Sequence, residues 1–145
     1  MAIQAQDARV TIAGVEVSTA HWIDGRRVPS NRTFENFSPI DGRHLAHLSA
    51  GGAEEANAAV AAARRAFPAW AALGPAGRLP ILKRFADGIL ARTDQLAALE
   101  TIDNGSLLSG NRERMVARAA HNIEFFAEWP MRPREPIESP TVTNH

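Results

Sequence analysis

The sequence predicts an α+β protein in which β-hairpins come first and about four α-helices follow. Up to about residue 50 the apolar residues alternate and are interrupted by glycine-containing turns, whereas from Ala53 they recur at helical spacing. Strands followed by helices, without alternation of the two, are typical of α+β folds. No internal repeat and no linker divides the 145 residues, which is about the size of one domain.

The first strands are predicted on both sides of short turns. In VTIAGVEV, residues 10–17, the valines and the isoleucine fall on one side of a strand broken at Gly14, and a flexible leader over residues 1–20 is the alternative. Asp24-Gly25 in HWIDGRRV accepts the positive φ angles of a type I′ turn, so a hairpin is expected there.

Another hairpin is expected around Asp41-Gly42, between TFENFSPI and RHLAHLS. Pro39 indicates that this pair lies at a sheet edge or begins in a bend, because proline cannot donate a hydrogen bond to a neighbouring strand. The apolar faces of the hairpin are expected to carry Phe34, Ile40, Leu45 and Leu48.

Helical spacing from Ala53, with two glutamates in the first turn opposing the helix dipole, predicts a helix. It is expected to end near Phe67 at Pro68, which leaves Trp70 on a turn or a short second piece. Gly51-Gly52 opens this helix but lacks the pattern of a phosphate-binding loop, so a helix start is the better interpretation.

Three more helices are predicted: one from about Pro75, one from a Thr93-Asp94 cap to Asn104-Gly105, and one from about Ser109 to Trp129. After Pro130 the prolines of PMRPREPIESP predict an extended tail. The inner faces are expected to carry Leu79, Leu82, Phe85, Ala86 and Ile89 on the first of these helices, Leu96, Leu99 and Ile102 on the second, and Met115, Ala119, Asn122 or Ile123, and Phe126 on the third.

Composition excludes several classes of protein. Sixteen basic residues balance sixteen acidic ones, which disfavours nucleic acid as a partner. No run of about 18 apolar residues is present, so no membrane span is expected. The absence of cysteine excludes disulfides, thiolate metal sites and a nucleophilic thiol, and is consistent with a cytoplasmic location.

No catalytic, cofactor-binding or metal-binding residue is predicted. His44 and His47 form a close pair, but three residues apart on a strand places them on opposite faces, so they are interpreted as surface histidines. Nothing in the spacing of Ser109, His121 and Asp103 favours a catalytic triad.

The remaining charged residues are also assigned to the surface. Lys83, the only lysine, is predicted on a solvated flank of the second helix rather than as a Schiff-base or phosphate lysine. The carboxylates Asp87, Glu100 and Asp103 are expected to be scattered, whereas acid/base catalysis needs two that converge. The set Arg112, Arg114 and Arg118 could accept a phosphate, but nearby glutamates favour a solvated helix face.

Several motifs together resemble the N-terminal part of NAD(P)-dependent aldehyde dehydrogenases. They are WIDGRRV, FENFSPIDG, AVAAARRAFPAW at residues 59–70, GRLPILKRFADGIL, LAALETIDNG and FFAEW. FFAE is similar to the carboxymethyl-hydroxymuconate type of semialdehyde dehydrogenase. Ser106 and Leu107 depart from the family, which usually has lysine and proline there, and the tail after residue 132 resembles it only in position.

The resemblance implies that residues 21–145 are a truncated N-terminal part of the cofactor-binding domain. The family's oxyanion asparagine, cofactor lysine, glycine-rich turn, general-base glutamate and nucleophilic cysteine lie further along and have no counterpart here. The complete enzyme would oxidise an aldehyde with NAD or NADP, and this chain alone is expected to be inactive and to bind neither cofactor tightly. Expected partners are the remainder of the dehydrogenase, another subunit, or a second copy of the chain. A stand-alone interaction protein is the alternative.

Overall fold

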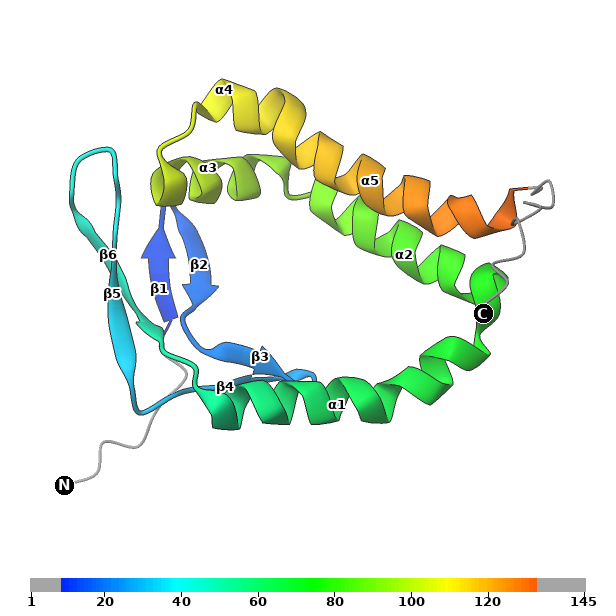
Figure 1. Cartoon of the computed structure of the whole chain (residues 1–145). Coiled ribbons are helices and arrows are strands. Elements are labelled where there is room, and N and C mark those ends of the chain that lie inside the picture. Colours follow the sequence, from blue (N-terminus) through cyan, green and yellow to red (C-terminus); the bar gives the residue numbers. More distant parts are fainter. Residues whose placement is uncertain (1–8, 133–145) are drawn as a thin grey trace, which may run out of the picture.

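The computed structural model describes residues 9–132 and has three two-stranded antiparallel sheets followed by helices, as expected for an α+β fold (Figure 1). The strands are β1 (Arg9–Ile12), β2 (Val15–Ser18), β3 (His21–Ile23), β4 (Arg26–Val28), β5 (Thr33–Phe37) and β6 (His44–Ser49). The helices are α1 (Ala53–Ala72), α2 (Gly74–Leu90), α3 (Thr93–Asn104), α4 (Leu108–Gly110), the π-helical turn η1 (Asn111–Met115), α5 (Val116–Glu128) and the 3₁₀ turn η2 (Trp129–Met131).

Two of the sheets are tight hairpins closed by two residues with positive φ. Asp24 and Gly25 have φ angles of 55° and 74°, which confirms the predicted turn between β3 and β4. Ala13 and Gly14 have φ angles of 52° and 77° and join β1 to β2. The single strand broken at Gly14 is therefore wrong, because the chain reverses there and pairs its two halves.

The hairpin of β5 and β6 is confirmed, but its loop is longer than the Asp41-Gly42 dipeptide. The Ser38 N–H donates to the Arg43 carbonyl at 2.9 Å, which fixes Phe37 opposite His44. The next pair joins Asn36 to Ala46, so Leu45 is an extra residue on β6, a β-bulge.

Helix α1 continues through Pro68 to Ala72, so the prediction that it ends near Phe67 is wrong, and Trp70 lies within the helix. Proline removes one intrahelical hydrogen bond and bends a helix without always ending it. Figure 1 shows the last turns of α1 leaving the line of the first ones. At the other end the Gly52 N–H donates to Glu55 Oε2 at 2.6 Å, which confirms the helix start.

Helices α2 and α5 lie side by side and form the main packed unit (Figure 1). Ala86 of α2 is buried, as are Val116, Ala120 and Ala127 of α5. Small side chains at these positions allow the two backbones to approach closely. The expectation that Phe85 lies on the inner face of α2 is wrong, since 60% of its surface is exposed.

The inner face predicted for the last helix is also wrong, by one position. Met115 and Phe126 are exposed, and the buried positions are instead their next neighbours, Val116 and Ala127. The buried positions keep α-helical spacing, and Ile123 between them is half-buried, so the predicted period is right and only its phase is shifted by one residue.

Helix α3 is joined to η1 by a buried polar contact. Asn111 Nδ2 donates to Thr101 Oγ1 at 2.9 Å and to Ser106 Oγ at 2.7 Å. Gly105 has a φ of 78°, which confirms the predicted left-handed end of α3. Thr93 does not cap the helix as predicted, because its hydroxyl donates to the Leu90 carbonyl at 2.7 Å.

The core of the described residues is small. Six apolar side chains are buried, and five of these are alanines: Ala46, Ala86, Ala97, Ala120 and Ala127, with Val116 the sixth. Many large apolar side chains are exposed instead, among them Trp22, Phe67 and Leu107. Across residues 9–132, no helix is both long and apolar enough to cross a bilayer.

Candidate functional site

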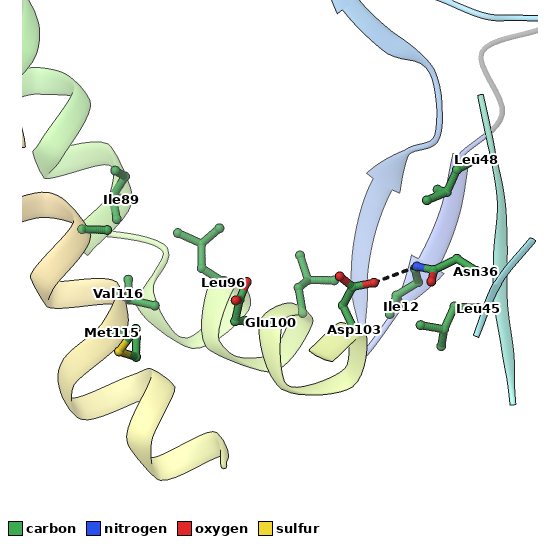
Figure 2. Close-up of a pocket in the computed structure, with 12 residues that line it drawn as sticks. Ile12, Asn36, Leu45, Leu48, Ile89, Leu96, Glu100, Asp103, Met115 and Val116 are labelled. Carbon is green, nitrogen blue, oxygen red and sulfur yellow. Dashed lines mark hydrogen bonds between the residues drawn. The ribbon is translucent and has the colours of Figure 1, made fainter. Parts of the chain in front are cut away.

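An apolar pocket of about 630 Å³ lies between the hairpins and the helices. Figure 2 shows that strands β1, β5 and β6 border one side and α3 with the start of α5 the other. Its apolar lining consists of Ile12, Leu45, Leu48, Ile89, Leu96, Leu99, Met115, Val116 and Ala119.

Three polar side chains reach this pocket, and none is arranged for catalysis. Asn36 Nδ2 donates to Asp103 Oδ1 at 2.7 Å across the pocket edge (Figure 2). Glu100 accepts from Asn104 Nδ2 at 2.7 Å. Glu100 and Asp103 thus share one helix and one pocket and are not scattered as predicted, although both are already hydrogen-bonded to amides. The pocket is suited to apolar contact rather than to proton transfer.

Glu35, His44 and His47 form a second cluster. The two histidines are exposed as predicted, but the prediction that they lie on opposite faces is wrong. The bulge at Leu45 places His44 and His47 on the same face of the hairpin, with ring centroids 4.7 Å apart. Glu35 is paired directly with His47 across the strands. One ligand atom from each of the three side chains lies within 4.8 Å of the others, and all three residues are exposed.

The residues considered for a catalytic triad are not brought together. Ser109 lies in α4, His121 in α5, and Asp103 is bonded to Asn36. Among residues 9–132, no hydrogen bond joins these three side chains.

Lys83 is engaged in an ion pair between α2 and α5. Its Nζ lies 2.8 Å from Glu128 Oε1, with both side chains about half exposed. The hydrogen bond and charge of Glu128 raise the pKa of Lys83, and Lys83 lowers the pKa of Glu128 in return. A lysine nucleophile needs the opposite shift. The sequence predicts Lys83 on a solvated flank, and the structure instead places it half-exposed in this ion pair.

Arg112 and Arg114 of η1 and Arg118 of α5 do not form one phosphate site. Arg112 is paired with Asp94 at 2.6 Å, and the hydrogen bond between them lowers the pKa of Asp94. Arg114 and Arg118 border a shallow depression together with His121. One of the three guanidinium groups is therefore neutralised by a carboxylate from α3.

The N-terminus of α1 does not fit the pyrophosphate of a dinucleotide cofactor. Such a group binds backbone N–H groups at a helix N-terminus. At α1 the Glu55 carboxylate already accepts the Gly52 N–H, and this hydrogen bond lowers the pKa of Glu55. A carboxylate at that position repels a phosphate.

Sequence reasoning missed the cluster on β5 and β6 because it assumed a regular strand. The length of the loop between β5 and β6 could have revealed it. The backbone hydrogen bond from Ser38 to Arg43 closes this loop and fixes Phe37 opposite His44. Leu48 must also lie opposite Phe34 to face the apolar pocket. These two pairings are consistent only if one residue of β6 bulges.

Comparison with known proteins identifies relatives of known activity. The model of the aldehyde dehydrogenase family matches residues 25–144. The 5-carboxymethyl-2-hydroxymuconate semialdehyde dehydrogenase of Escherichia coli is 41% identical over 108 residues, which cover 74% of this chain and 23% of that protein.

Solved structures give the same result. The structure of PnpE in complex with nicotinamide adenine dinucleotide is 39% identical, with a TM-score of 0.70 over 72% of this chain and 22% of that one. The aldehyde dehydrogenase KauB from Pseudomonas aeruginosa is 33% identical, with a TM-score of 0.74 over 83% of this chain and 25% of that one. The chain spans about a quarter of the length of these relatives, and its family match covers most of its residues: it belongs to the aldehyde dehydrogenase family.

Proposed function

We propose that this chain is the N-terminal segment of a semialdehyde dehydrogenase that oxidises an aldehyde to a carboxylic acid with NAD(P)⁺. The family match over residues 25–144 is the observation that carries the proposal. The similarity to a semialdehyde dehydrogenase at 41% identity supports a semialdehyde as substrate. The cytoplasmic location proposed here is supported by the absence of cysteine from the chain.

The exposed apolar surface supports a role as part of a larger unit. Helix α1 has no buried residue, although Val60 and Phe67 belong to its apolar stripe. Soluble domains rarely leave so many large apolar side chains uncovered. In the proposed enzyme, the remainder of the dehydrogenase covers these residues, and it supplies the nucleophile, the base and the cofactor site.

Reconstitution with a relative tests this proposal. The E. coli semialdehyde dehydrogenase, prepared without the part that matches this chain, would be mixed with the 145-residue protein, and NADH formation followed with a semialdehyde. We expect neither component alone to be active and the mixture to form NADH. Calorimetric titration of the chain alone with NAD⁺ is expected to give no tight binding. Tight binding would contradict the assignment of the cofactor site to the remainder.

The second candidate function is a stand-alone interaction protein that pairs with itself or with a complete dehydrogenase. The same exposed apolar side chains favour it, because association also covers them. An immunoblot of the native cells with an antibody to this region separates the two functions. A band several times larger than 15.7 kDa supports the enzyme segment, whereas a band at 15.7 kDa supports the interaction protein.

A further inference from the structure

The hairpin of β5 and β6 gathers three potential metal ligands on the face opposite the apolar pocket. We call Glu35, His44 and His47 the histidine face. Asn36 and Leu48 point to the pocket, whereas Glu35 and His47 alternate with them and lie on the other side. The bulge at Leu45 rotates His44 onto that same side.

The ligand atoms are close enough for one ion to bridge them. They all lie within 4.8 Å of one another, whereas tetrahedral zinc with bonds of about 2.1 Å needs separations of about 3.4 Å. All three residues are exposed, so small rotations of the side chains can close this difference. In the described part of the chain, no hydrogen bond or ion pair competes for the three side chains.

The donor set selects a class of ion. Two imidazole nitrogens and one carboxylate oxygen suit zinc and similar divalent transition metals, whereas calcium and magnesium require oxygen ligands. Three protein ligands also leave a fourth position for water. We propose that Glu35, His44 and His47 form a surface site for a divalent transition-metal ion, with Zn²⁺ as the expected occupant.

The contacts already present favour this arrangement without metal. His44 packs edge-on against Phe37, with ring centroids 5.4 Å apart, which restricts the imidazole on one side. The two strands carrying the ligands are hydrogen-bonded neighbours, so the backbone positions are fixed before an ion binds. Such preorganisation lowers the entropic cost of binding.

The test is a zinc titration of the complete 145-residue chain, prepared without a polyhistidine tag, in competition with a chromophoric chelator. We expect one Zn²⁺ to bind per chain at the histidine face. His44→Ala and His47→Ala are each expected to weaken binding by at least about tenfold, and Glu35→Gln by a similar factor. Circular dichroism of each variant establishes that the fold is retained.

His121→Ala is the matched control, because His121 is an exposed histidine on α5, away from the hairpin. We expect it to bind zinc as the unmodified chain does. Equal losses in His121→Ala and His44→Ala would overturn the proposal, as would a folded chain that binds no zinc.

A second measurement uses Co²⁺, whose visible absorption reports coordination by nitrogen and oxygen. We expect the spectrum of bound Co²⁺ to disappear in His44→Ala. A variant that lacks Leu45 is expected to keep it, because the deletion leaves His44 and His47 two residues apart on a regular strand and therefore on the same face. An unchanged Co²⁺ spectrum in His44→Ala would overturn the assigned ligands.

Discussion

Helices α1 and α5 are both rich in alanine, yet they differ in what surrounds them. The twenty residues of α1 include no buried side chain, whereas α5 buries Val116, Ala120 and Ala127 against α2 and α3. Composition alone therefore does not decide whether an alanine-rich helix is part of a core. The difference is whether the partner helix lies within the chain, and for α1 we propose that it lies in the remainder of the dehydrogenase.

The largest expected effect comes from enlarging a buried alanine of α5. Ala120 is 1% exposed, so Ala120→Leu forces α2 and α5 apart. We expect the free energy of unfolding to fall by about 3 kcal/mol. Chemical denaturation measures this change. Ala61→Leu on the exposed side of α1 is the control, and an equal loss there would contradict the contrast between the two helices.

Removing the amide of Asn111 is expected to have the next largest effect. Asn111 is 3% exposed and donates to both Thr101 and Ser106. Asn111→Ala leaves two hydroxyls without this partner and is expected to cost about 2 kcal/mol of unfolding free energy. Thermal denaturation of Asn111→Ala and of the control Asn122→Ala, which changes an exposed asparagine of α5, measures the two losses of stability. No difference between the two variants would show that η1 is not held by this contact.

Phe67 on α1 is expected to affect association much more than stability. It is 65% exposed, so Phe67→Gln should change the unfolding free energy of the monomer by less than about 0.5 kcal/mol. Dye binding to apolar surface and self-association, followed by analytical ultracentrifugation, should both decrease. A stability loss above about 1 kcal/mol would mean that α1 is already packed in the isolated chain.

The smallest effect is expected from the ion pair that links α2 to α5. Lys83 lowers the pKa of Glu128 from 4.5. The ionised Glu128 therefore stabilises the folded state above pH 4.5, and this stabilisation is lost as pH falls through the lowered pKa. The raised pKa of Lys83 has the opposite pH dependence: the stabilisation from the charged lysine is lost only as pH rises beyond 10.5. Glu128→Gln should therefore reduce the acid dependence of unfolding slightly. Identical pH profiles for the two proteins would contradict this contribution.

Local signals in the sequence were sufficient for several elements. Asp24-Gly25 predicted a turn, and Gly105 predicted the end of α3, because each depends on a positive φ that few residues accept. The order of hairpins before helices followed from the change of period near Ala53. Family membership followed from the motifs, above all AVAAARRAFPAW.

Other features depend on pairing and packing that local patterns do not contain. The bulge at Leu45 results from the loop and the apolar pocket acting on the same strand. The π turn at residues 111–115 is accompanied by contacts of the buried Asn111 with α3. Pro68 lies within α1, although a proline at that position predicts the end of a helix. The candidate metal site was missed for the first of these reasons.

Every strand of the described chain pairs with the strand next to it in sequence. During synthesis, each hairpin can therefore form as soon as its second strand leaves the ribosome, before α1 emerges. In the proposed dehydrogenase, the apolar stripe of α1 would then remain exposed until much later residues are made. Because of this order of translation, the apolar stripe of α1 would need to be covered, for example by a chaperone, while the rest of the enzyme is still being synthesised.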